Sequence, residues 1–135
     1  MGIEYTFYDY IDADGSGANV IKDWLNGAGK PAKAHFTNMI GNLEASPPPA
    51  FIDSVWHKPF TEAMKGQWDG FIEIKKRGRI QYRLIAQIQG RNVFLVATGF
   101  HMGSYETDVT PGTAKERVAQ MMNNPARYRR EHDYR

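Results

Sequence analysis

The chain has 135 residues, of which 41% are hydrophobic and 13% aromatic, enough for one domain with a single core. No apolar run approaches the about 18 residues of a membrane helix, and the sequence contains no cysteine, which excludes disulfides and thiolate metal sites. The first residues lack the basic and apolar regions of a secretory signal. A cytoplasmic protein without membrane attachment is therefore expected.

The net charge of +2 conceals an uneven distribution of charge along the chain. Residues 1–21 carry acidic side chains and neither Lys nor Arg, whereas basic residues gather in the middle of the chain and near its end. Such regions suit a polyanion, because each cation that replaces a counterion on phosphate contributes salt-dependent affinity. A solvated charged surface explains the charge pattern equally well.

The first half of the chain predicts a strand followed by two helices. Residues 3–11 alternate as an edge strand does, and residues 19–26 place apolar side chains on one helical face before Gly27. Pro31 suits the first turn of a second helix, which the prolines at 47–49 end. The two helices predict a helical hairpin, and a loop is expected over residues 50–65.

The second half predicts three consecutive strands and a last helix. Residues 79–89 alternate strictly, with a polar face interrupted only by Ile85, and the nearly apolar residues 93–100 predict a central strand. A loop is expected at residues 103–109, followed by a helix with Thr110 as its N-cap and then a basic tail, 126–135. The whole chain, 1–135, is predicted to be one α+β domain with helices packed against an antiparallel sheet.

Short sequence stretches in a fixed order resemble a known superfamily. They are Lys65-Gly66, the run Gly-Phe-Ile-Glu-Ile-Lys at 70–75, Gln81-Tyr82-Arg83, Gly99-Phe100, and Pro111 with an alanine-bearing helix. Together they resemble the RelE/HigB superfamily of toxin-antitoxin modules, and most of all its phage-derived Gp49-like branch, over about residues 3–125. The resemblance implies a RelE-like fold with an N-terminal helical hairpin, an antiparallel sheet and a C-terminal helix.

The same resemblance implies a function and partners. It implies a toxin that acts as a ribosome-associated mRNA endoribonuclease and is inhibited by a cognate antitoxin, usually a helix-turn-helix protein. Its partners would be mRNA, the ribosome and the antitoxin, and no cofactor is implied. His35 and His57 have no metal-ligand partners at useful spacing, and no metal site is expected.

Four residues are candidates for the catalysis of RNA cleavage. Attack of a ribose 2'-hydroxyl on the adjacent phosphate requires a base, an acid, and cations for the charge that develops on phosphorus. Glu73 and Lys75 lie two apart on one predicted strand and share a face, and Arg83 can bond two phosphate oxygens. His101 can transfer protons near neutral pH, with Glu73 or Lys75 as its counterpart.

Further cations are candidates for nucleic-acid binding, together with one aromatic residue that can stack on a base: Lys65, Lys76, Arg77, Arg79, Arg127, Tyr128 and Arg130. The sequence departs from the superfamily at His101-Met102, where paired lysines are typical. This departure leaves a second interpretation open, a non-catalytic phage or prophage module that binds nucleic acid or protein on the same fold. In that interpretation Glu73 forms a cross-strand ion pair and His101 is a structural histidine, and neither takes part in catalysis.

Overall fold

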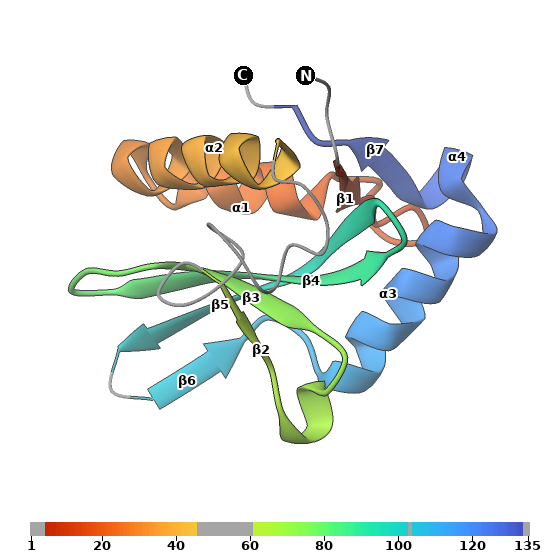
Figure 1. Ribbon diagram of the computed structural model, residues 1–135. Helices are drawn as coiled ribbons and strands as arrows, with labels where there is room; N and C mark the ends of the chain where they lie inside the picture. Colours follow the sequence, from red (N-terminus) through yellow and green to blue (C-terminus); the bar gives the residue numbers. More distant parts are fainter. Residues whose placement is uncertain (1–4, 46–60, 103, 134–135) are drawn as a thin grey trace.

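The protein is built on one mixed β-sheet with helices on both faces (Figure 1). The computed structural model describes residues 5–45, 61–102 and 104–133, and within them seven strands form this sheet. In chain order the elements are β1 (Thr6–Tyr10), α1 (Val20–Gly27), α2 (Lys30–Glu44), β2 (Thr61–Ala63), the 3-10 turn η2 (Gly66–Trp68), β3 (Ile72–Lys76), β4 (Gln81–Gln89), β5 (Asn92–Met102), β6 (Ser104–Thr107), α3 (Pro111–Asn123), α4 (Pro125–Tyr128) and β7 (Arg129–Glu131).

The sheet has the order β2-β3-β4-β5-β1-β7, and most neighbouring strands are antiparallel. The exception is β1, which runs parallel to the first half of β5, while β6 folds back on the second half of β5. The α+β class and the three-strand meander of β3, β4 and β5 agree with the sequence prediction. The sheet is mostly antiparallel, as predicted, but it is mixed, because the chain after β1 returns through two helices and the meander and places β5 beside β1 in the same direction.

Three local predictions were wrong. The first strand is not an edge strand, because β7 pairs with its outer side. Residues 103–109 were expected to be a loop, but 104–107 form β6, which continues the sheet beside β5. Residues 61–63, expected in a loop, form β2 on the edge of β3. Residues 50–60 of that expected loop and the prolines 47–49 lie outside the described residues.

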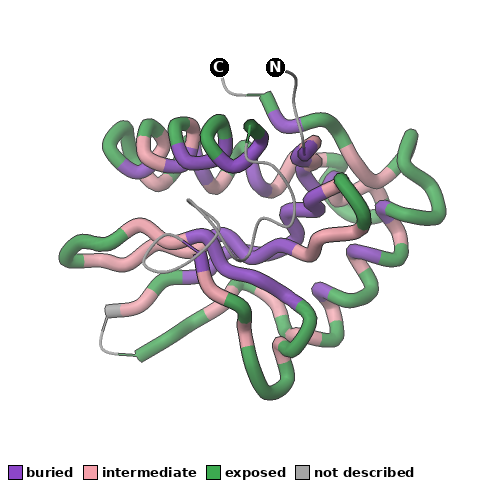
Figure 2. Tube along the Cα trace, in the orientation of Figure 1, coloured by how far each residue is buried: buried purple, intermediate pink, exposed green. Residues whose placement is uncertain are grey.

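Two hydrophobic cores lie on the two faces of the sheet. The hairpin of α1 and α2 covers one face, where Phe36, Ile40 and Leu84 are fully buried. On the other face α3 packs its Val118 and Met121 against strand residues that include Ile85. Ile85 interrupts the polar face of its strand because α3 covers the sheet at that point. Figure 2 shows the resulting pattern, with buried residues on the inner sides of the helices and in the middle of the strands.

The C-terminal segment is part of the fold rather than a free basic tail. After α4, residues of β7 pair with β1, and the backbone N–H of His132 donates to the carbonyl oxygen of Phe7 over 2.8 Å. The two ends of the described chain consequently lie close together (Figure 1). Among the described residues, no helix is long and apolar enough to cross a membrane.

Candidate functional site

The structure brings the four candidate catalytic residues to one face of the sheet. Lys75 of β3 pairs directly with Arg83 of β4, and residues opposite one another in a ladder share a face. Glu73 lies two residues before Lys75, and His101 of β5 pairs with Gln81, two residues before Arg83. Because side chains alternate along strands, all four project to the side of the sheet on which Ile85 contacts α3. His101 therefore does not point into the core beneath α1 and α2.

Glu73 is the centre of a hydrogen-bonded network. The residue is only 7% exposed, and its two carboxylate oxygens accept hydrogen bonds from Arg83 Nη1 over 2.6 Å and from the Tyr105 hydroxyl over 2.7 Å. Arg83 Nη2 also donates to Gln81 Oε1 over 2.8 Å. Both carboxylate oxygens are thus already engaged. The network fixes the position of the Arg83 guanidinium and leaves Glu73 little capacity to remove a further proton.

One nitrogen of the Arg83 side chain makes no hydrogen bond. Among the described residues, its Nε is a buried side-chain nitrogen without a hydrogen-bond partner. A buried donor without a partner costs free energy, typically about 1–3 kcal/mol, so this nitrogen is an unfavourable feature of the site. The guanidinium carbon also lies 4.9 Å from the centre of the Tyr105 ring, a cation–π contact that holds the side chain over β6.

Tyr105 is a site residue that the sequence analysis missed, because residues 103–109 were interpreted as a loop. Burial raises the pKa of its hydroxyl, and the hydrogen bond to Glu73 acts in the same direction, so the hydroxyl keeps its proton and donates it. The His101 ring stacks near the Tyr105 ring, with centroids 6.3 Å apart and planes 27° from parallel. We call Glu73, Lys75, Arg83, His101 and Tyr105 the site face.

The absence of a side chain at Gly99 allows Tyr105 to pack closely against β5. This buried glycine pairs with Arg83 on one side and Thr107 on the other, in the middle of an apolar strand. A Cβ at this position would lie 2.8 Å from the Glu106 carbonyl oxygen and 3.3 Å from the Tyr105 ring. The glycine is the one sequence signal for the site beside it, since a glycine inside a strand often marks a close approach of another chain segment.

A small depression adjoins the site face. Lys75 Nζ donates to Glu62 Oε1 of β2 over 2.7 Å, so the two neighbouring cations Lys75 and Arg83 each have their own carboxylate. The depression, of about 250 Å³, is lined by Glu62, Glu73 and Tyr105 and bordered by the exposed Lys65. Of the residues expected to bind nucleic acid, Lys65 is therefore the one that borders the site.

The other residues expected to bind nucleic acid lie elsewhere. Lys76 and Arg79 line a cavity on the opposite face of the sheet, and Arg77 is exposed in the turn between β3 and β4.

The C-terminal candidates are near β7. Arg127 and Tyr128 hydrogen-bond Asp14 over 2.5 and 2.7 Å, and these bonds, that of Arg127 first, lower the pKa of the Asp14 carboxyl. Arg130 donates to the carbonyl oxygens of Ala126 and Arg129. The basic residues therefore form separate groups rather than one cationic surface, and the tail is partly neutralised by the acidic N-terminal segment.

The described part of the chain holds no cluster of three or more His, Cys, Asp or Glu side chains that could bind a metal ion. Comparison with known proteins gave no match to any family model, curated protein or solved structure. The resemblance to the RelE/HigB superfamily therefore stays a prediction from the sequence.

Proposed function

We propose that this protein is an endoribonuclease that cleaves mRNA, and that it is the toxin of a toxin-antitoxin module. The observation that supports the proposal best is the position of His101 on the same face as Arg83, Lys75 and Glu73, beside Tyr105. A proton-transfer group next to fixed cations is what cleavage by a ribose 2'-hydroxyl requires. The resemblance to the RelE/HigB superfamily supports the same function.

In the proposed mechanism, each residue of the site face has one task. His101 accepts the proton of the 2'-hydroxyl as its oxygen bonds to phosphorus. The phosphorus–oxygen bond to the 5' oxygen then breaks, and Lys75 donates a proton to that oxygen, leaving a 2',3'-cyclic phosphate. The Arg83 guanidinium, held by Glu73, stabilises the additional charge on the phosphate oxygens. Tyr105 offers a ring on which a neighbouring base can stack.

A second candidate function is a binding module that contacts RNA or a protein without cutting. Two observations favour it: Glu73 already accepts two hydrogen bonds, and Lys75 is paired with Glu62. A network in which these groups already have partners is expected in a sheet without catalytic activity as much as in an active site. The two functions differ in whether RNA is cleaved, and this difference can be measured.

Induced expression in a bacterial host separates the two functions. We expect the wild-type protein to arrest growth and to cleave mRNA on ribosomes, with His101→Ala reducing cleavage by about 100-fold because the proton acceptor is lost. Arg83→Ala should reduce cleavage at least as much. Lys115→Ala is the control, since Lys115 is exposed on α3 and should keep full activity.

Arg83→Ala also leaves Glu73 buried without its cation, so circular dichroism must confirm that this variant is folded. Half-buried His101 avoids this difficulty. A wild-type protein that binds RNA, leaves it intact and does not slow growth would remove the nuclease proposal and favour the binding module. Co-expression of the neighbouring open reading frame tests the antitoxin, which should restore growth.

A further inference from the structure

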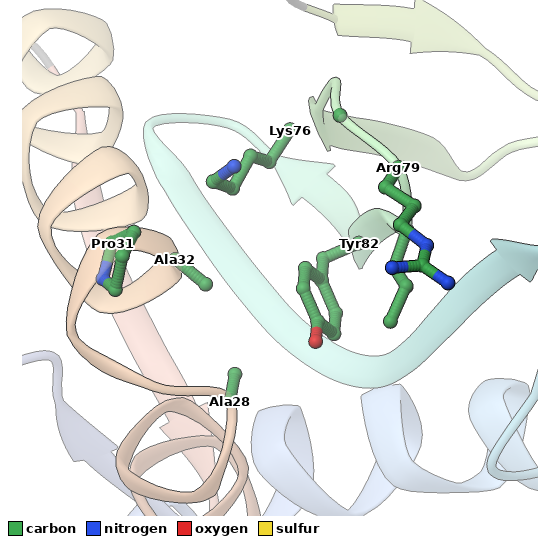
Figure 3. Close-up of a pocket in the computed structure, with 8 residues that line it drawn as sticks. Ala28, Pro31, Ala32, Lys76, Arg79 and Tyr82 are labelled. Carbon is green, nitrogen blue, oxygen red and sulfur yellow. The ribbon is translucent and has the colours of Figure 1, made fainter.

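A second cavity lies on the opposite side of the sheet from the site face. Its volume is about 270 Å³, and it lies between the turn that joins α1 to α2 and the hairpin that joins β3 to β4. Figure 3 shows Lys76 and Tyr82 projecting from the two strands toward Pro31 and Ala32 of α2. Lys76 follows Lys75 directly in β3, so the two side chains project from opposite faces of the sheet.

The walls of this cavity are mostly apolar. Ala28, Pro31 and Ala32 line it on the helical side, and Ile80 and Tyr82 line it on the side of the sheet. The Tyr82 ring is held by an edge-to-face contact with Trp24, with centroids 5.8 Å apart and planes at 77°. An apolar or aromatic group can therefore enter a surface that is already formed.

Among the described residues, the charged side chains that line the cavity are both cations, Lys76 and Arg79, and none is a carboxylate. The Lys76 amine donates only to the Arg77 carbonyl oxygen, at 3.3 Å, and Arg79 has no ion pair within the described residues. Lys75 and Arg83 across the sheet are, by contrast, each neutralised by a glutamate. The cavity thus carries two uncompensated positive charges beside an apolar wall.

We propose that this cavity binds a phosphate monoester carried by a small apolar or aromatic group. A monoester carries about −1.5 to −2 charges at neutral pH, which matches the two cations. The planar Arg79 guanidinium can bond two phosphate oxygens, Lys76 supplies a point charge, and the walls accept the organic group. The inference rests on the cavity alone and is independent of the proposed nuclease activity.

Titration of the intact chain with phenyl phosphate, inorganic phosphate and phenol, followed by backbone amide NMR, tests the proposal. Phenyl phosphate should bind about tenfold more tightly than either fragment. Lys76→Gln combined with Arg79→Gln should weaken its binding about tenfold or more, whereas Lys115→Gln, an exposed control on α3, should not. Equal affinity of the double variant and the wild type, or equal binding of all three compounds, would overturn the proposal.

The same ligand chemistry occurs in free small molecules and at the 5' end of an RNA strand. A tetranucleotide with a 5'-phosphate that displaces phenyl phosphate, while its 5'-hydroxyl form does not, would identify the RNA end. Displacement by neither would identify a small molecule, and equal displacement by both would overturn the preference for a monoester. A wild-type protein that binds phenyl phosphate but does not cleave RNA would contradict the nuclease proposal alone, so the two proposals can fail separately.

Discussion

At the scale of single residues, the buried carboxylates differ in how they are compensated. Glu73 accepts hydrogen bonds from Arg83 and Tyr105. Glu44 on α2 is 8% exposed, and burial raises the pKa of its carboxyl, although the charge of His132 and a hydrogen bond from the Phe7 backbone oppose the rise. The ionised form of Glu44 is therefore less favourable in the folded chain than in the unfolded chain.

Replacing Glu44 by Gln should stabilise the protein at neutral pH. Because the folded pKa is above the ordinary value of 4.5, the favourable contribution of Glu44 is complete below that value and is lost as pH rises through the folded pKa. Glu44→Gln should therefore raise the free energy of unfolding at pH 7, by less than about 1 kcal/mol because His132 and the Phe7 backbone offset part of the cost of burying the charge. Urea denaturation at pH 7 and pH 4 measures the effect, and a gain of equal size at both values would contradict it.

The sequence predicted part of the site at this scale, and physical reasons separate that part from the rest. Alternation along strands placed Glu73, Lys75 and Arg83 on one face, because this inference needs only the period of a strand. Tyr105 was missed because its position depends on β6 pairing with β5. The carboxylate partner of Lys75 was also missed, since Glu62 belongs to the short strand β2 within an expected loop.

At the scale of elements, the N-cap residues of α3 and α1 differ in how many elements they stabilise. The Thr110 hydroxyl accepts from the Thr113 backbone N–H and caps α3. Asn19 accepts from the Lys22 backbone N–H and caps α1, and its amide nitrogen also donates to the buried Asp9 over 2.9 Å. Asn19 therefore joins α1 to β1.

Asn19→Ala should consequently cost more than Thr110→Ala. Loss of a cap alone costs about 1 kcal/mol, which we expect for Thr110→Ala. Asn19→Ala should cost about 2 kcal/mol, because an oxygen of buried Asp9 also loses its donor. Chemical denaturation of both variants measures the difference. Equal losses would show that the contact between Asn19 and Asp9 adds nothing to the cap.

The elements also show where periodicity is a sufficient guide. The hairpin of α1 and α2 and the N-terminus of α3 agree with the prediction, because apolar spacing, Gly27 and the Thr110-Pro111 pair are local signals. The position of β1 between β5 and β7 depends instead on contacts between distant segments. Its pattern of alternation is compatible with an edge or an interior strand, so the sequence did not distinguish them.

At the scale of the whole molecule, the acidic beginning of the chain is bonded to its basic end. Arg127 pairs with Asp14 at the surface, where both side chains are about half exposed. His132 Nδ1 lies 2.7 Å from Asp9 Oδ1, and both side chains are 2% exposed. These contacts between acidic residues near the N-terminus and basic residues near the C-terminus hold β7 beside β1. The uneven charge distribution of the sequence therefore has a structural role, in addition to any role in binding a polyanion.

The buried pair should stabilise the fold far more than the exposed pair. Asp9→Ala and His132→Ala should each cost about 1–3 kcal/mol, because each removes a hydrogen bond between two buried polar groups. The double variant should lose less than the sum of the two, since both single variants remove the same contact. Arg127→Ala, the exposed control, should change the free energy of unfolding barely measurably, because water replaces the lost partner. Urea denaturation of the four variants tests these values, and strictly additive losses at Asp9 and His132 would show that the two residues stabilise β1 and the C-terminal segment independently.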